Sequence, residues 1–228
     1  MEVKLLSHTP NTQQLVATAA RLCYSADDID DILKKMEDEK GKKLINKLIK
    51  LGHQSPFEHI SFTFGISGVS RSLTHQLVRH RIASYSQKSQ RYVAESKFDY
   101  ITPPSIQKNE EAAKKYGQLM EKIANCYEEL SEIAPKEDAR YVLPNSCETK
   151  IVATFNARSL FNFFNHRMCT RAQWEIRLLS EKIYEIVNEI APEIFSHFGA
   201  SCDSLGYCPE GSMCCGKAPT LEEKRRQK

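Results

Sequence analysis

Alternating hydrophobic and polar positions mark the segments of this chain that we expect to be extended. Residues 60–67 alternate isoleucine and phenylalanine with small polar residues, and residues 149–157 are rich in β-branched side chains. A period of two is typical of a strand with one buried face, and β-branched residues pack well on a pleated surface. Shorter apolar segments occur at residues 4–10 and 98–104. The pattern therefore predicts a small sheet built from these segments.

Apolar residues spaced three to four apart indicate helices in most of the remaining chain. Asn11 or Thr12 can cap the first helix, and Gly52 can end the third. Residues 84–92 lack this period and are expected to form an ordered loop, whereas residues 221–228 are expected to be disordered. The predicted helices cover residues 12–22, 27–39, 42–52, 70–80, 109–133, 135–143 and most of 158–198. We therefore predict an α+β fold, with a small antiparallel sheet flanked by long helices in a single domain.

The size and composition of the chain narrow the class of protein. It has 228 residues, of which 41% are hydrophobic and 27% charged, in the usual range for one globular domain. No apolar segment has the length of a signal sequence or of a membrane span, so we expect a cytoplasmic protein that binds no membrane. A net charge of +3 argues against a protein that coats nucleic acid by bulk charge.

The C-terminal segment differs in character from the rest, and we divide the chain into a main domain, residues 1–198, and a tail, residues 199–228. The tail is rich in glycine and cysteine and ends in basic residues. Its cysteines could bind zinc, form a redox-labile disulfide or remain reduced thiols, because their spacings are not the paired C-x-x-C of strong zinc sites. These cysteines are Cys202, Cys208, Cys214 and Cys215.

Two segments of the chain carry arginines without any acidic residue nearby in sequence. No Asp or Glu lies between Glu58 and Glu95, or between Glu148 and Glu175, although even scatter of the 29 acids would place roughly eight there. Unpaired guanidinium groups are costly to bury, and they match the oxygens of phosphate with two parallel hydrogen bonds. The pattern therefore favours a phosphate-bearing ligand over a plain solvated surface.

The densest basic sequence, residues 79–91, begins where a predicted helix runs into a loop of small hydroxyl residues. Exposed backbone N–H groups, hydroxyls and three arginines could together hold more than one phosphate. His80 lies between Arg79 and Arg81, which favours the neutral form of its imidazole. A neutral His80 could donate to or accept from a cofactor ring, or it could be a packing residue.

The helix predicted after the last strand carries a stripe of amide and guanidinium side chains. Arg158 and Asn162 are four residues apart, and Asn165 is seven from Arg158, so the three share a face. Arg171 follows one turn after Arg167. Such a stripe can present hydrogen bonds to a heterocycle and positive charge to a phosphate.

A polar sequence before the alternating segment could suggest a metal site, since it contains His53, Glu58 and His59. The spacing is irregular and no nearby cysteine completes a ligand set, so we expect no metal there. A polar loop that leads into a ligand cleft is the favoured interpretation.

The basic loop also matches a family signature. At every fixed position of Arg79-His-Arg-x-x-Ser84-x-x-x-x-Ser89-x-Arg91, the chain resembles the flavin-dependent thymidylate synthases. The sequences GHQSPFEHISFTF, ARYVLP, NARSLFNFFNHR and AQWEI resemble that family too, and they occur in the family's order. The resemblance covers about residues 3–198, which would make the main domain a catalytic domain.

The resemblance implies a homotetramer whose sites are shared between subunits, and it assigns side chains to each ligand. Those expected to contact FAD are Ser55, Glu58, Arg79, His80, Arg81, Ile82, Asn156, Arg158, Asn162 and Arg171. Those expected to hold deoxyuridylate (dUMP) are Gln76, Gln87, Ser89, Arg91, Arg140 and Arg167. His53 and Tyr92 would lie near the path of folate and nicotinamide.

The implied reaction is the methylation of dUMP to thymidylate (dTMP). NADPH would reduce FAD, 5,10-methylenetetrahydrofolate would supply one carbon, and the reduced flavin would finally supply hydride. Arg167, at the uracil oxygens, would stabilise charge as carbon 5 becomes nucleophilic, and we name it with His53 as a catalytic residue. Ser89 is expected to bind phosphate rather than act as a nucleophile, because no base is evidently placed to activate it.

Two other interpretations stay open. Family members often have Asn-Glu where this chain has Ser86-Gln87, so a flavoprotein acting on a different nucleotide is the alternative within enzymes. A nucleic-acid-binding module that uses the basic loop 79–91 is the alternative outside enzymes. The small net charge and the scarcity of aromatic residues near the loop argue against it. The residue at the position of Arg171 varies in the family, which weakens its assignment to flavin.

Overall fold

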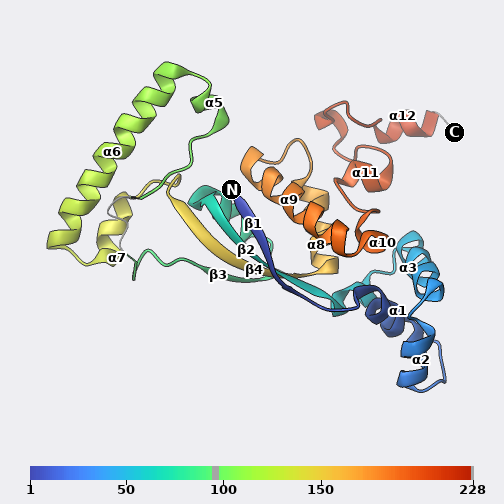
Figure 1. Cartoon of the computed structure of the whole chain (residues 1–228). Helices are drawn as coiled ribbons and strands as arrows, with labels where there is room; N and C mark the ends of the chain where they lie inside the picture. The colour runs from blue at the N-terminus through green and yellow to red at the C-terminus, as the bar shows by residue number, and fades with distance from the viewer. Residues whose placement is uncertain (94–97, 227–228) are drawn as a thin grey trace. The chain divides into compact units, whose positions relative to one another are not determined.

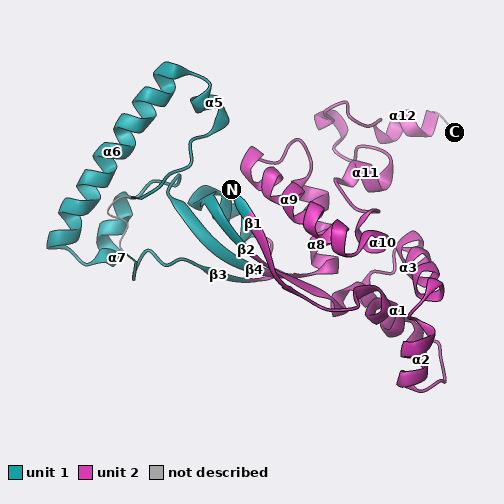
Figure 2. Cartoon of the chain, in the orientation of Figure 1, with its two compact units in different colours: residues 1–2, 65–79, 85–153 teal, residues 3–64, 80–84, 154–228 magenta. Residues whose placement is uncertain are grey.

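The computed structural model describes residues 1–93 and 98–226 (Figure 1). Contacts within the chain divide it into two compact units, which are coloured separately in Figure 2. Each of the four strands has residues in both units, so the division does not follow the order of the sequence. Unit 1 comprises residues 1–2, 65–79 and 85–153, and unit 2 comprises residues 3–64, 80–84 and 154–228.

The described residues form one four-stranded antiparallel sheet with the strand order β1-β2-β4-β3. Its strands are β1 (Glu2–His8), β2 (Ser61–Ser70), β3 (Ser84–Gln87) and β4 (Glu148–Asn156). Buried and half-buried residues alternate along most of β2, as the sequence pattern predicts. The α+β class with one small antiparallel sheet is therefore confirmed.

Two predictions are wrong, one of a loop and one of a strand. The expected loop at residues 84–92 begins with β3, a strand of four residues that is too short for its alternation to stand out. The expected strand at residues 98–104 is reduced to one isolated bridge between Tyr100 and Cys147. Pro103 and Pro104 limit pairing there, because proline has no N–H group to donate to a neighbouring strand.

Unit 1 surrounds a small apolar core with helices. Ser70 caps α4, since its hydroxyl accepts from the Leu73 N–H at 3.0 Å, and Asn109 caps α6 through the Ala112 N–H at 3.0 Å. Helix α4 ends three residues earlier than predicted. The elements are α4 (Arg71–Leu77), α5 (Pro104–Gln107), α6 (Glu110–Ile133), α7 (Lys136–Ala139) and the 3-10 turn η2 (Arg140–Val142). One apolar cluster of the unit consists of Phe98, Met120 and Cys147, with Tyr116, Ile123, Ala124 and Leu143 packed against it.

Unit 2 holds the helices before β2 and after β4. Gly52 ends α3 in the left-handed conformation (φ 71°), as predicted. Asn11 precedes α1 at φ 49°, but its side chain makes no capping hydrogen bond. The elements are α1 (Thr12–Leu22), α2 (Ile29–Lys35), α3 (Glu39–Leu51), the 3-10 turn η1 (Ser55–His59), α8 (Ala157–Arg167), α9 (Trp174–Ile190) and α10 (Pro192–Phe195).

Phenylalanine rings form much of the core of unit 2. The rings of Phe57 and Phe161 meet edge to face with centroids 5.3 Å apart, and Phe62 meets Phe195 in the same way at 5.5 Å. Phe161 also stacks on Phe198. Edge-to-face pairs are favoured by the charge distribution of the rings, so this core fixes α8 firmly against η1 and α10.

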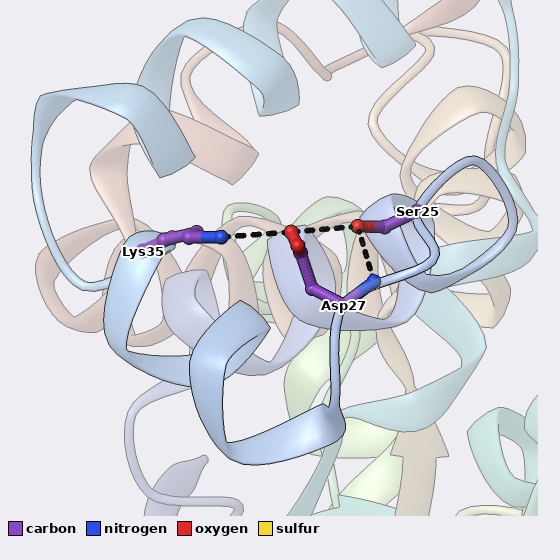
Figure 3. A network of polar contacts seen from close by, with 3 residues as sticks. All are labelled: Ser25, Asp27 and Lys35. Atoms are coloured by element: carbon purple, nitrogen blue, oxygen red, sulfur yellow. Dashed lines mark hydrogen bonds and ion pairs between the residues drawn. The ribbon is translucent and has the colours of Figure 1, made fainter.

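A polar network joins the end of α1 to α2 at the surface of unit 2 (Figure 3). The carboxylate of Asp27 accepts from the Ser25 hydroxyl at 2.9 Å and from the Lys35 ammonium group at 2.8 Å. These hydrogen bonds lower the pKa of Asp27, the bond from Lys35 contributing most. The side chains are exposed, so the network orients the connection without forming part of the core.

The tail contains α11 (Ser201–Leu205), the 3-10 turn η3 (Gly211–Met213) and α12 (Leu221–Arg226). The disorder expected from residue 221 onward is therefore wrong for residues 221–226. Thr220 and Glu223 form a capping box: the Glu223 carboxylate accepts from the Thr220 N–H at 2.7 Å, and the Thr220 hydroxyl accepts from the Glu223 N–H at 3.3 Å. That capping sequence is a signal that sequence reasoning missed. None of the helices in the described residues is both long and apolar enough to cross a membrane.

Candidate functional site

The basic loop and the start of α8 are joined by a chain of hydrogen bonds in unit 2. The Nε2 atom of His80 lies 2.6 Å from the hydroxyl oxygen of Ser159, and the Ser159 hydroxyl donates to the backbone carbonyl of Ile82. A serine hydroxyl has one proton, so it cannot also donate to His80. Neutral His80 therefore carries its proton on Nε2 and donates to Ser159, which leaves the lone pair on Nδ1.

The environment of His80 keeps its ring neutral. Burial lowers the pKa of His80 below the ordinary value of 6.5, and the positive charge of Arg167 lowers it further. The ring packs against Phe155 and Phe163, at centroid distances of 5.7 and 5.6 Å. The lowered pKa agrees in direction with the expected neutral imidazole, but burial is the main cause and not the charges of Arg79 and Arg81.

Two residues of the stripe predicted on α8, Arg158 and Asn162, are exposed, whereas the third, Asn165, is half-buried, and the opposite face of the helix is buried. Asn156 stands at the N-cap of the helix, where its side-chain oxygen accepts from the Ser159 N–H at 2.8 Å. Arg158 forms an ion pair with Glu58 of η1, and Asn162 is exposed one turn later. Asn156 thus has a capping role, whereas Arg158 and Asn162 present polar groups outward.

The other residues assigned to flavin lie at the surface. Ser55 is exposed at the start of η1, and Arg79 and Arg81 are exposed on either side of His80. The side chain of Ile82 is 71% exposed, which is unusual for a large apolar residue beside charged groups. Within the described part of unit 2, no carboxylate lies within ion-pair distance of Arg81, so its charge is available to an anion.

The argument from acid-poor segments is wrong for three arginines. Arg91 pairs with Glu137 at 2.9 Å, Arg158 pairs with Glu58, and Arg171 pairs with Glu210. Each carboxylate comes from a distant part of the sequence, because folding brings partners together that sequence proximity does not reveal. All three ion pairs are exposed, so each is weak and leaves its arginine accessible to a stronger anion.

Most residues assigned to dUMP belong to unit 1. Both amide hydrogens of Gln87 are used within the unit, since Nε2 donates to the hydroxyls of Thr74 at 2.9 Å and Thr149 at 3.3 Å. A ligand would therefore meet Gln87 through its side-chain oxygen. Gln76 and Ser89 are half-buried on α4 and after β3.

Two arginines of unit 1, Arg91 and Arg140, both contact Glu137. Arg140 donates to the backbone carbonyl of Glu137 at 3.0 Å, and the Arg91 guanidinium lies 5.5 Å from the centre of the Tyr92 ring. Tyr92 is itself 76% exposed. The structure therefore brings Arg91, Arg140 and Glu137 together in a single exposed cluster.

Arg167 and Arg171, the remaining assigned residues, line a pocket of about 330 Å³ in unit 2. Its walls come from residues 165–172 and from the tail. His53, by contrast, is exposed just after Gly52, and its N–H donates to the Leu48 carbonyl at 2.9 Å as part of the end of α3. None of the eight cysteines forms a disulfide in this structure, and no cluster of residues suited to a metal ion occurs within residues 1–93 and 98–226.

Known proteins identify the family. Residues 4–193 match a family model described as thymidylate synthase complementing protein. The flavin-dependent thymidylate synthase of Clostridium tetani is 48% identical over 98% of this chain and 96% of its own length. That of Nitratidesulfovibrio vulgaris is 46% identical over 95% of both chains, and that of Pyrococcus furiosus is 36% identical over 100% of this chain and 96% of its own. The chain belongs to the flavin-dependent thymidylate synthase family.

Membership of this enzyme family agrees with the resemblance drawn from the signature at residues 79–91. It gives no support to a nucleic-acid-binding module. The structure adds one residue that the sequence did not single out. Ser159 connects His80 to Ile82, yet in the sequence it is only a small polar residue after Arg158, and no spacing rule distinguishes it.

Proposed function

We propose that this member of the flavin-dependent thymidylate synthase family methylates dUMP to dTMP. In the proposed reaction 5,10-methylenetetrahydrofolate supplies the carbon, NADPH is the reductant, and the products are dTMP, tetrahydrofolate and NADP⁺. Because these are metabolites of nucleotide synthesis, we expect the enzyme in the cytoplasm. The observation that carries the proposal is the half-buried His80 hydrogen-bonded to Ser159 within the family signature.

The donor set of unit 2 fits FAD. Arg81 and Arg158 offer exposed guanidinium groups to a pyrophosphate, and Asn162 offers an amide to a heterocycle. Ile82 provides an exposed apolar surface next to His80, as a planar ring requires. When bound, FAD would supply the hydride and the redox chemistry that no amino-acid side chain can provide.

The chain's own residues would orient the ligands and stabilise charge. Ser159 fixes the tautomer of His80, so the Nδ1 atom of the ring can only accept a hydrogen bond. Arg167 raises the positive potential in the same unit, as the lowered pKa of His80 indicates. We assign to Arg167 the stabilisation of negative charge on the uracil oxygens as carbon 5 becomes nucleophilic. His53 stays a proposed residue of the folate and nicotinamide path.

We further propose a homotetramer whose sites are shared between subunits, as the family resemblance implies. The assigned residues fall in both compact units: Arg91 and Arg140 belong to unit 1, whereas Arg158 and Asn162 belong to unit 2. Co-expression of Arg91→Ala and Arg158→Ala, assayed at ligand concentrations at which neither variant alone turns over, tests this proposal. Shared sites would restore roughly a quarter of the activity in mixed tetramers, and unshared sites would restore none.

Absorption spectroscopy of the purified protein tests the ligand assignments. Added FAD should co-elute with the protein in gel filtration, and its visible bands should shift when dUMP is added. Failure of FAD to co-elute would contradict the proposal. A shift with uridylate equal to that with dUMP would instead favour the flavoprotein that acts on another nucleotide, the alternative suggested by Ser86 and Gln87.

A further inference from the structure

The pocket beside Arg167 has a wall that lies beyond the residues matched by the family model. One side is formed by residues 165–172 at the end of α8 and just beyond it, and the other by residues 200–217 of the tail. The family model ends at residue 193, so the whole tail wall lies outside it. We call this cavity of about 330 Å³ the tail pocket. Its volume is sufficient for a phosphate group and part of the molecule that carries it.

The tail pocket is lined by positively charged side chains and by apolar side chains. Arg167, Arg171 and Lys217 line it together with one carboxylate, that of Glu210, which gives an excess of positive charge. Two methionines, a proline and two alanines supply the apolar part of the lining: Met168, Met213, Pro209, Ala172 and Ala200. Such a lining suits an anion attached to a less polar body.

The only acidic group in the lining is held by a weak contact. Glu210 pairs with Arg171, and both side chains are 42% exposed, so the ion pair is strongly screened by solvent. Lys217 lies 4.0 Å from Asp203, and both of these side chains are also exposed. Neither contact provides the stability that would prevent a ligand from replacing the carboxylate.

A phosphate would make better contacts than Glu210 does. The guanidinium of Arg171 can donate two parallel hydrogen bonds to phosphate oxygens, and a phosphate carries more charge at neutral pH than a carboxylate. Lys217 lines the same pocket and can meet the same group as a point charge. The Glu210 side chain, at the end of an exposed turn, can rotate towards solvent.

We propose that the tail pocket binds a phosphate group, which replaces the Glu210 carboxylate at Arg171 and contacts Lys217 of the tail. This inference rests on the proposed function for the identity of the ligand, because FAD, dUMP and NADPH all carry phosphate. The tail then supplies one binding residue, Lys217, and one internal competitor, Glu210. Glu210 keeps the pocket in order while it is empty and weakens the binding of the anion.

Titration calorimetry of the full chain with inorganic pyrophosphate tests the site without depending on turnover. Arg171→Gln and Lys217→Gln should each weaken binding by about fivefold or more, while Glu210→Gln should strengthen it by about threefold. Charge-matched controls are Lys114→Gln on exposed α6 and Glu222→Gln on exposed α12. Circular dichroism melts would confirm that every variant is folded.

Several outcomes would overturn the proposal. Equal loss of binding in Lys114→Gln would mean that pyrophosphate responds to general charge. Unchanged or weaker binding in Glu210→Gln would mean that Glu210 positions Arg171 and does not compete. Displacement of bound pyrophosphate by FAD, dUMP or NADPH identifies the natural source of the phosphate, and displacement by none of them would overturn the assignment.

The same experiment separates this inference from the proposed function. Pyrophosphate binding with the predicted variant pattern, in a protein that never retains FAD, would contradict the proposed function and leave the phosphate pocket standing. A protein that retains FAD and makes dTMP, with no effect of Arg171→Gln or Lys217→Gln on pyrophosphate, would contradict only the phosphate pocket.

Discussion

The two ends of α8 hold their functional residues in opposite ways. At its start, His80 packs against two phenylalanine rings and is hydrogen-bonded to the buried Ser159. Beyond its end, Arg171 is held by the exposed carboxylate of Glu210. Burial makes the first arrangement costly to disturb, because a missing partner leaves a polar group without water. Solvent makes the second easy to rearrange.

This difference indicates that the two kinds of residue need different surroundings. A group whose protonation state matters, such as His80, needs a fixed and partly dry environment. A group that we propose to receive a ligand's charge, such as Arg171, needs a partner that can leave. Substitutions near His80 should therefore change stability first, and substitutions near Arg171 or Arg91 should change ligand affinity first.

The largest effect is expected from Phe163→Ala. Phe163 is buried and contacts both His80 and Phe155, so its removal leaves a cavity at the start of α8. We expect the free energy of unfolding to fall by about 3–5 kcal/mol in urea denaturation. Ile133→Ala, at a side chain that is 82% exposed, should change it by less than about 0.5 kcal/mol. Similar losses in the two variants would remove the contrast between buried and exposed regions.

The next largest effect is expected from Ser159→Ala. The free energy of unfolding should fall by about 1–3 kcal/mol, because the substitution leaves the Nε2–H of His80 and the Ile82 carbonyl without their shared partner. The control is Ser105→Ala at an exposed position of α5. In the flavin-loaded protein the Ser159 variant should also bind FAD more weakly. A variant as stable as the control would show that the hydrogen-bond chain does not fix the loop.

Arg91→Ala tests the exposed side of the comparison in unit 1. Its ion pair with Glu137 has both side chains 51% exposed, so stability should change by less than about 1 kcal/mol. Affinity for dUMP should fall by about tenfold or more, and affinity for FAD much less. Lys115→Ala, which breaks the exposed ion pair with Glu111, should change neither affinity. Equal losses for dUMP and FAD would mean that the two ligands are assigned to the wrong residues.

The protonation of His80 gives a smaller effect that depends on pH. Its pKa is lowered in the folded protein, so below about pH 6.5 the unfolded chain binds a proton that the folded chain does not. Stability should therefore fall as pH drops through and below this value. His80→Asn can still donate to Ser159 and should flatten this dependence in urea denaturation measured at several pH values. His75→Asn, at an exposed residue of α4, should leave it unchanged.

The smallest effect is expected at the network of Figure 3. Asp27→Asn removes an exposed carboxylate whose pKa is lowered mainly by Lys35, so the melting temperature at neutral pH should fall by only about one or two degrees. The stabilisation by the ionised group is present above the ordinary pKa of 3.8 and is lost as pH falls through the lower folded value. A difference in melting temperature between Asp27→Asn and the unsubstituted protein that persists below the folded pKa of Asp27 would contradict this origin.

The sequence predicts elements whose signals are local and misses contacts that depend on folding. Alternation located β2, and Gly52 located the end of α3, because each feature is a property of neighbouring residues. The partners of Arg91, Arg158 and Arg171 could not be inferred, since each carboxylate is brought in from a distant segment. Burial of His80 by phenylalanines of β4 and α8 was hidden for the same reason.

The other differences between prediction and structure occur where the sequence signal is short or is masked by the composition around it. β3 has only four residues, and the helix α12 begins with a capping box inside a charged segment that otherwise resembles a disordered end. The family signature, in contrast, could be read directly, because its fixed residues lie within one short segment, residues 79–91.

Mass spectrometry of the nucleotide product tests the central claim most directly. The purified protein, loaded with FAD, would be incubated with dUMP, 5,10-methylenetetrahydrofolate and NADPH, with each component omitted in turn. We predict that dTMP forms only in the complete mixture, and that the Arg167→Ala variant with FAD bound forms almost none. Formation of dTMP without flavin, or its absence from the complete mixture with FAD bound, would contradict the proposed function.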